Sequence, residues 1–255
     1  MIIAIAGQAG SGKDESANFL CDQLNLKKMA FADPIKRFGF HVFGFSEDQL
    51  WGSSSKRDEV DPRFTKAKIP QGAQISENTC SKGWVDANTH IRYDSYSHDW
   101  LEDVFGIGSG YRIWDLEHWL KELARSNPEL TPRDMLRSLG DWGKEAGDNE
   151  IWVDSFERSY KAVMQGYPYS QAAGIISDDQ DNPADGVVVS DMRYPNEVAA
   201  VRRVPNSVCI LIQRDTDRKD EHPSEHPLDK SIFDFVIDNN NSREDLFSML
   251  GALNL

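Results

Sequence analysis

The sequence predicts an α/β fold with a parallel β-sheet, because apolar runs of strand length alternate with amphipathic stretches of helix length. Each apolar run is short and bounded by turn residues, as is typical of strands that are buried on both faces. The predicted strands are Ile2–Ala6, roughly Lys28–Ala32, Val187–Ser190, Val208–Gln213 and Phe235–Asp238. We therefore expect about five parallel strands with helices on both faces of the sheet.

Local signals place the helices between these strands. In the segment that begins at Thr131, the threonine suits the N-cap, Pro132 the first helical position and Asp134 the third. The predicted helices are Lys13–Leu24, Asp33–Phe43, Thr131–Leu139, Asn149–Met164, Asn196–Arg203 and Arg243–Leu253.

Two regions depart from this alternation. Residues 44–127 are rich in Ser, Asp, Trp and His and have weak periodicity, apart from an amphipathic stretch over 113–124. Residues 170–186 are polar and acidic, and we expect them to form a solvated loop. The sequence therefore predicts one domain over residues 1–255, with a lid-like insertion at about 44–127.

Composition narrows the class of protein. Hydrophobic residues make up 39% and charged residues 27% of the chain, which is ordinary for a soluble globular protein. No apolar run reaches the roughly 18 to 20 residues that a bilayer span needs, and three scattered cysteines suggest neither a disulfide framework nor a zinc site. A net charge of -14 argues against general nucleic-acid binding. We expect a cytoplasmic protein without a membrane or nucleic-acid partner.

A glycine-rich turn between the first strand and the first helix predicts a phosphate site. Residues 7–14 read Gly-Gln-Ala-Gly-Ser-Gly-Lys-Asp, which matches Gly-x-x-x-x-Gly-Lys in the strand–loop–helix context that the motif needs. The glycines let successive backbone N–H groups point at phosphate oxygens, and the helix adds its positive N-terminal end. Lys13 adds a full charge. A turn that binds nothing is the disfavoured alternative.

The residue after this lysine departs from the common motif. Ser or Thr usually stands there and binds magnesium through its hydroxyl, whereas this chain has Asp14. A carboxylate can also coordinate Mg²⁺, directly or through water, but Asp14 could instead cap the loop or contact the lysine. Ser16 or Ser11 is then the candidate for the missing hydroxyl. The sequence leaves these alternatives open.

A second acidic position follows the predicted strand at 187–190. Ligands of open α/β sheets bind at the carboxyl ends of strands, so Asp191 is a candidate for magnesium or a substrate hydroxyl. Arg193 would then lie within reach of a transferring phosphate. The alternative is that Asp191 caps the next helix, while Arg193 pairs with Glu197 on the surface.

A pair of arginines lies on one predicted helix. Arg133 and Arg137 are four residues apart and share a helical face, which suits a phosphate bound by bidentate hydrogen bonds. A solvated basic face is the alternative. Trp152 follows downstream, and the sequence does not decide whether it stacks on a base or fills the core.

Together these residues resemble the deoxynucleoside monophosphate kinases of tailed phages, within the P-loop NMP kinase superfamily. The matching segments are Gly-Ser-Gly-Lys-Asp at 10–14, Phe-Ala-Asp-Pro-Ile-Lys at 31–36, the Arg133/Arg137 helix, Asn-Glu-Ile-Trp-Val at 149–153 and Ser-Asp-x-Arg-x-x-x-Glu at 190–197. The resemblance implies a P-loop kinase fold and transfer of the γ-phosphoryl group of ATP to a deoxynucleoside monophosphate (dNMP), with Mg²⁺. It also implies the host cytoplasm if the protein is phage-encoded.

The resemblance further implies a role for each matching position. ATP would be bound by Gly7, Gly10, Ser11, Gly12, Lys13 and Asp14. The catalytic charges would be Lys13, Arg133, Arg137 and Arg193. The acceptor would lie against Asp33, Lys36, Arg133, Arg137, Trp152, Asp191, Arg193 and Glu197. The candidates for the metal are Asp14, Ser16 and Asp191. The expected oligomer is a homodimer.

Three other functions fit part of the pattern, and the weakest is a nucleic-acid end kinase, which the acid excess and the missing basic stripe disfavour. The other two are as follows. A kinase acting on dephospho-coenzyme A or phosphomevalonate is one, because the last strand and helix resemble the former family and the latter also uses Gly-Lys-Asp. A non-catalytic ATP-binding module is the other, and the acidic strand end and paired arginines count against it.

Overall fold

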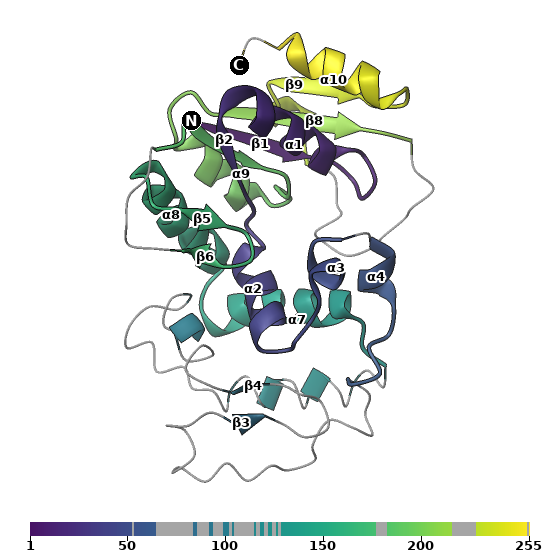
Figure 1. Ribbon diagram of the computed structural model, residues 1–255, viewed down its shortest axis with the longest axis vertical. Helices are drawn as coiled ribbons and strands as arrows, with labels where there is room; N and C mark the ends of the chain where they lie inside the picture. The colour runs from purple at the N-terminus through teal and green to yellow at the C-terminus, as the bar shows by residue number, and fades with distance from the viewer. Residues whose placement is uncertain are drawn as a thin grey trace. The chain divides into compact units, whose positions relative to one another are not determined.

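The computed structural model describes residues 1–52, 54–64, 84–85, 92–93, 99–101, 104, 115, 118–119, 122–123, 126, 129–176, 183–215, 228–253 and 255. The chain forms two compact units (Figure 1). Unit 1 contains Met1–Asp33 and Phe156–Leu255, and unit 2 contains Pro34–Ser155. Within the described residues, no helix is long and apolar enough to cross a membrane.

Unit 1 is built on a five-stranded sheet in the order β2-β7-β1-β8-β9, with every neighbouring pair parallel. The strands are β1 (Ile2–Ala6), β2 (Leu26–Met29), β7 (Gly186–Val189), β8 (Val208–Gln213) and β9 (Phe235–Asp238). Every residue of β1 and β7 is buried, as expected for central strands covered on both faces. The predicted α/β fold class is confirmed.

Helices flank this sheet. Helices α1 (Lys13–Leu24) and α10 (Arg243–Gly251) cover one face, and α9 (Pro195–Arg202) lies on the opposite face (Figure 1). Leu20 of α1 and Leu250 of α10 join Ile5 in one apolar cluster with the sheet. Unit 1 also holds the hairpin β5 (Tyr169–Ser170) and β6 (Gly174–Ile175), and a 3₁₀ helix, η3 (Lys230–Ile232).

Unit 2 contains mostly helices in its described part. They are α2 (Asp33–His41), α3 (Glu47–Leu50), α4 (Ser54–Asp58), α7 (Pro132–Ala146) and the start of α8 (Ile151–Met164), beside the antiparallel pair β3 (Trp84–Val85) and β4 (Arg92–Tyr93). The core is aromatic: Phe38 packs with its ring centroid 4.4 Å from Trp100 and 5.1 Å from Phe43. Phe45 and Phe64 add to the same cluster.

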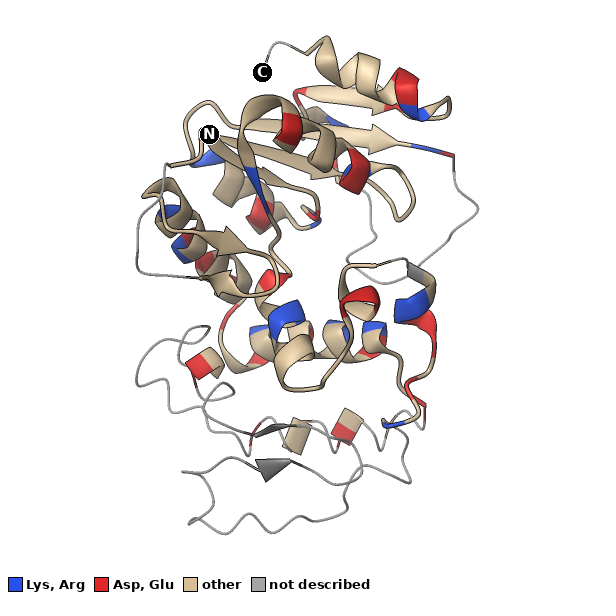
Figure 2. Cartoon of the chain, in the orientation of Figure 1, with Lys and Arg blue, Asp and Glu red and all other residues tan. Residues whose placement is uncertain are grey.

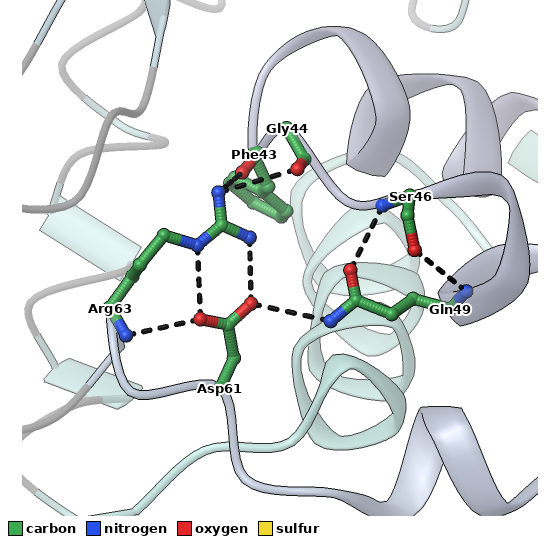
Figure 3. A network of polar contacts seen from close by, with 6 residues as sticks. All are labelled: Phe43, Gly44, Ser46, Gln49, Asp61 and Arg63. Atoms are coloured by element: carbon green, nitrogen blue, oxygen red, sulfur yellow. Dashed lines mark hydrogen bonds and ion pairs between the residues drawn. The ribbon is translucent and has the colours of Figure 1, made fainter.

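A network of polar contacts joins Asp61 and Arg63 to Gln49 and to the backbone at Phe43 and Gly44 (Figure 3). Asp61 is buried and accepts two hydrogen bonds from the guanidinium group of Arg63, at 2.6 and 3.0 Å. The same guanidinium donates to the carbonyls of Phe43 and Gly44, and Gln49 donates to Asp61 at 3.4 Å. The network therefore fixes the chain at 61–63 against the turn that follows α2.

Most predicted elements have the observed bounds to within two residues, and β2 is an exception. The predicted strand at roughly Lys28–Ala32 lies instead at Leu26–Met29. Residues 30–32 cannot extend the strand, because their backbone N–H groups are bound by carboxylates in a turn.

The predicted end of the helix at Leu139 is also wrong. Thr131 does cap the helix with Asp134 in a capping box, but α7 continues through Gly140 and Gly143 to Ala146. A side chain at Gly143 would place its Cβ 2.2 Å from the Trp152 ring. Glycine is therefore needed there for packing, and it does not mark a helix end.

Two expectations fall on regions that the structure describes in part. The predicted loop at 170–186 contains part of the β5–β6 hairpin, so it is not wholly irregular. Most of the amphipathic stretch 113–124 lies outside the described residues, and Asp115, His118, Trp119, Glu122 and Leu123 of it are helical. The predicted insertion at about 44–127 lies within unit 2, and the single domain stays a prediction.

Candidate active site

The turn between β1 and α1 has the tight backbone that its glycines predict. Gly10 and Gly12 have φ values of +83° and +97°, in the left-handed region that favours glycine. A Cβ at Gly12 would lie 2.5 Å from Nδ2 of Asn239, and a Cβ at Gly7 would lie 2.5 Å from the carbonyl oxygen of Ile212. Glycine is thus required at Gly7 and Gly12 by close approach of other atoms.

Helix α1 starts without a capping side chain. Its N-cap is Gly12, whereas α3, α7 and α10 each begin with a capping box. The first N–H groups of a helix have no partner within the helix, and they bind anions when nothing else caps them. The N-terminal end of α1 therefore presents N–H groups that no side chain caps.

Three side chains of the loop and first turn are largely buried. Lys13 is 8% exposed, and its Nζ donates to the carbonyl oxygen of Gln8 at 3.4 Å. The Ser16 hydroxyl donates to the carbonyl oxygen of Gly12 at 3.0 Å. The Ser11 hydroxyl has no hydrogen-bond partner in the described part of the chain, while its carbonyl accepts a bond of 2.7 Å from Asn239.

Asp14 contacts two residues that the sequence did not single out. Its Oδ1 accepts a hydrogen bond of 2.8 Å from the Ser190 hydroxyl, and lies 3.7 Å from the Nζ of Lys28. Lys28 also donates to Asn18 at 3.0 Å. The lysine that it contacts here is Lys28 of β2, and contact with Lys13 stays a prediction.

Two acidic residues hold the turn that follows β2. The Ala30 N–H donates to Oδ2 of Asp33 at 2.7 Å. The next two N–H groups, of Phe31 and Ala32, donate to Oδ1 and Oδ2 of Asp191, each at 2.9 Å. Asp191 therefore shapes this turn and does not cap α9, which was its alternative role.

Asp33 is also bound from the β5–β6 hairpin. It is 1% exposed and accepts hydrogen bonds from the Tyr169 hydroxyl at 2.7 Å and from the Gln171 amide at 3.0 Å. Since a carboxylate accepts but cannot donate, these donors match its charge. The hairpin and the turn after β2 are thereby joined at one buried carboxylate.

Glu197 binds backbone in the same way. It is buried and accepts from the N–H groups of Arg193 at 2.6 Å and Tyr194 at 3.0 Å, at the start of α9. Burial and the nearby charge of Asp191 raise the pKa of Glu197 to about 8, although both hydrogen bonds and the charge of Arg193 lower it. Glu197 is thus a buried residue that caps the start of α9. The alternative, in which it pairs with Arg193 on the surface, does not fit its burial.

The remaining predicted site residues belong to unit 2. Arg133 and Arg137 are both partly exposed on α7. The Nε of Arg133 donates a hydrogen bond to Oδ1 of Asp58 at 2.5 Å. The Nζ of Lys36 lies 6.0 Å from the Trp51 ring centroid. Trp152 is 5% exposed and donates from Nε1 to the Gly140 carbonyl at 2.9 Å. Its contacts favour core packing, and stacking on a base stays a prediction.

Unit 1 therefore brings together the loop, Asp14, Asp33, Asp191, Arg193 and Glu197, and unit 2 carries the other candidates. Acidic and basic residues are mixed along the helices of both units, for example along α7 (Figure 2). Sequence reasoning missed Ser190, Lys28, Asn239 and Tyr169. Ser190 and Asn239 each directly follow an apolar strand, which is the signal that could have identified them.

Comparison with known proteins gives consistent matches. The profile of a family described as Deoxynucleotide monophosphate kinase matches residues 121–250. The deoxynucleotide monophosphate kinase of Enterobacteria phage T4 is 21% identical over 98% of this chain and 96% of its own length. The deoxynucleoside-5'-monophosphate kinase of Escherichia phage T5 is 23% identical over 88% of this chain and 84% of its own length. A protein of Acanthamoeba polyphaga mimivirus, provisionally named a deoxynucleotide monophosphate kinase, is 23% identical over 98% of this chain and 94% of its own length.

Proposed function

This chain belongs to the deoxynucleotide monophosphate kinase family, and from that premise we propose how its residues serve the donor and the acceptor. It is a phosphotransferase that acts on deoxynucleoside monophosphates, and the family implies ATP as the phosphate donor. Transfer of the γ-phosphoryl group to the 5′-phosphate of the acceptor gives ADP and a dNDP. The roles of individual residues and of Mg²⁺ are our proposal.

The uncapped start of α1 carries the proposal for the donor. Glycines at Gly7 and Gly12 keep the loop free of side chains where other atoms approach closely, so the backbone and the N-terminal end of α1 can bind the phosphates of ATP. Lys13, the first residue of α1, adds a positive charge that neutralises the phosphoryl group during transfer.

Magnesium fits the acidic residue beside this loop. Mg²⁺ is usually held by one or two carboxylates with substrate phosphates and water, so an assembled protein cage is not required. The Asp14 side chain is 66% exposed, next to Lys13, and is a carboxylate of the right kind. Ser16 fits less well, because its hydroxyl donates to the Gly12 carbonyl inside the helix and not to the carboxylate of Asp14. Bound there, Mg²⁺ would neutralise charge on the phosphates.

For the acceptor, we propose that arginines supply most of the positive charge that the reaction needs. A phosphate oxygen is already ionised near neutral pH, so the reaction needs alignment and positive charge more than a general base. Arg133, Arg137 and Arg193 would supply this charge, and Lys36 would add to it. Arg133 also pairs with Asp58.

Asp33, Asp191 and Glu197 would act through the backbone that they hold. Their oxygens accept N–H groups of residues 30–32 and 193–194, so each shapes a turn next to a proposed substrate-binding segment. The homodimer stays a prediction, and light scattering on the purified protein would measure the oligomeric state. The absence of a nucleic-acid partner also stays a prediction.

A panel of acceptors tests the proposed function. ADP release from ATP and Mg²⁺ would be measured with dAMP, dGMP, dCMP and dTMP, with the matching ribonucleotides, and with dephospho-coenzyme A and phosphomevalonate. We expect turnover with at least one dNMP and none with the last two. Turnover restricted to dephospho-coenzyme A or phosphomevalonate would show a different small-molecule kinase, and ATP binding without ADP release would show a non-catalytic module.

A further inference from the structure

The hydrogen bond between Asp14 and Ser190 reverses a familiar pair of residue types. In common P-loop enzymes the residue after the loop lysine is Ser or Thr, and an acidic residue stands at the end of a neighbouring strand; together they hold Mg²⁺. Here the acidic residue, Asp14, follows the lysine, and the hydroxyl residue, Ser190, follows strand β7. The two residue types have exchanged positions.

The geometry supports this correspondence. Strand β7 pairs directly with β1, the strand that leads into the phosphate loop. Ser190 is 4% exposed, and its hydroxyl donates to Oδ1 of Asp14 at 2.8 Å. The hydroxyl proton is thus directed at the carboxylate, which leaves the lone pairs of the hydroxyl oxygen for a cation.

The other candidates for the metal, Asp191 and Ser16, are bonded to backbone groups and not to Asp14. Both oxygens of Asp191 accept backbone N–H groups from the turn after β2. Successive residues of an extended chain point in opposite directions, and here Ser190 contacts α1 while Asp191 contacts that turn. The Ser16 hydroxyl donates to a carbonyl one turn back in α1. Ser190 is therefore the hydroxyl that reaches Asp14.

We propose that Asp14 and Ser190 together bind the Mg²⁺ that accompanies ATP, with the carboxylate and the hydroxyl exchanged relative to the common P-loop arrangement. This inference rests on the proposed function, because it assumes that the loop binds a nucleotide. It assigns a role to Asp14, which the sequence left open, and adds Ser190 to the site.

Lys28 gives the proposal a second consequence. Its Nζ lies 3.7 Å from the same Asp14 oxygen that the Ser190 hydroxyl contacts. The pair is long and Asp14 is largely exposed, so the attraction is weak and contributes little to stability. A positive charge at that place nevertheless opposes the approach of a cation. Lys28→Met should therefore tighten metal binding.

The test uses Mn²⁺ in place of Mg²⁺, because free Mn²⁺ is counted directly by electron paramagnetic resonance. Titrations with saturating ADP would give the Kd of Mn²⁺ for each variant. We expect Asp14→Asn and Ser190→Ala each to raise this Kd by on the order of 10-fold or more, as loss of a metal ligand or its partner does. Ser16→Ala, the variant for the rival hydroxyl, should leave the Kd unchanged. Circular dichroism would verify that each variant is folded.

An exchange variant makes the test more specific. Asp14→Ser combined with Ser190→Asp restores the common arrangement, so it should bind Mn²⁺ more tightly than either Asp14→Ser or Ser190→Asp alone. The proposal is overturned if Asp14→Asn and Ser190→Ala bind Mn²⁺ as wild type does, if Ser16→Ala is the variant that loses binding, or if the exchange variant is no better than the single ones.

Binding of ADP without metal separates the two hypotheses. We expect it in wild type and in all these variants, because the loop amides and Lys13 are unchanged. If wild-type protein binds no ADP at all, the proposed function itself fails. If it binds ADP and phosphorylates a dNMP but Asp14 and Ser190 do not affect Mn²⁺, only this inference fails.

Discussion

The two units bind their buried carboxylates in different ways. In unit 1, Asp33 and Glu197 are buried and accept hydrogen bonds from backbone N–H groups of turns at the ends of β2 and β7. In unit 2, the buried Asp61 is paired mainly with one side chain, that of Arg63. In unit 1 the donors are backbone N–H groups and, for Asp33, the neutral side chains of Tyr169 and Gln171, whereas Asp61 accepts from the cationic side chain of Arg63 and from its N–H.

This difference predicts different effects of mutation. In unit 1 the loops that the acidic residues shape lie at the carboxyl ends of parallel strands, where ligands of such sheets bind. In unit 2 the Asp61–Arg63 pair stands against the aromatic rings of Phe45 and Phe64. We expect changes around the loop of unit 1 to reduce activity more than stability, and changes to the Asp61–Arg63 pair to do the reverse.

The largest effect is expected at the phosphate loop. Lys13→Ala should lower kcat by on the order of 10³-fold, because a charge that neutralises the transferring phosphoryl group is removed. The Tm should change by no more than about 3 °C, since the lysine is not part of the apolar core. Lys27→Ala, an exposed lysine on β2, is the control and should keep full activity. Full activity of Lys13→Ala would contradict the assignment of the loop.

Arg137→Ala tests whether unit 2 contributes charge to the reaction. We expect kcat to fall by on the order of 10²-fold or more with little change in Tm, because Arg137 is partly exposed on α7. Lys144→Ala, on the last turn of the same helix, is the matched control. A loss of stability in place of activity would mean that Arg137 serves only the fold.

Asp61→Asn should be the most destabilising of these changes and should spare kcat of the folded fraction. Removing the charge of one partner from a buried pair costs about 3 kcal/mol of unfolding free energy, measurable by urea denaturation. Arg63→Ala should cost a similar amount, and the double variant less than the sum. If the two losses are additive, the pair does not act as a unit.

The same residue gives a pH dependence. Burial raises the pKa of Asp61, but the hydrogen bonds and charge of Arg63 outweigh it and the pKa is lowered. A carboxyl group with a lower pKa in the folded state contributes stability above its unfolded pKa of about 3.9, and this is lost as pH falls through the folded value. Wild type and Asp61→Asn should therefore converge in stability only below about pH 4.

A second pH dependence concerns Glu197. Its folded pKa of about 8 is above the unfolded value, so the folded state binds the proton more tightly. Its contribution to stability is complete below the unfolded pKa and declines as pH rises to about 8, by at most about 1.4 kcal/mol per pH unit. Glu197→Gln resembles the protonated form, so its stability should decline less over this range. Parallel curves for the two proteins would disprove the raised pKa.

In unit 1, the sequence predicts the loop between β1 and α1 better than the contacts that reach it from other strands. The tight turn between β1 and α1 was predictable because Gly7, Gly12 and Lys13 lie within one short segment whose spacing is the signal. The partner of Asp14 was not, since Ser190 is 176 residues away in the chain and the strand pairing brings them together.

Unit 2 was harder to predict for a different physical reason. Its core depends on aromatic packing between short helices, and the stretch around Asp61 has little periodicity to indicate burial. The full length of α7 depends on Gly143 meeting Trp152, a tertiary contact that outweighs the usual meaning of glycine near a helix end. Local rules therefore worked best at the loop between β1 and α1.

The most direct test of the central claim follows the phosphoryl group itself. Purified protein would be incubated with Mg²⁺, one dNMP at a time and ATP radiolabelled at the γ-phosphoryl group, and the products separated by ion-exchange chromatography. We predict that the label passes to dNDP in equal amount to the ADP formed, and that Lys13→Ala abolishes this transfer. Label found only in inorganic phosphate, or no transfer to any dNMP, would contradict the account.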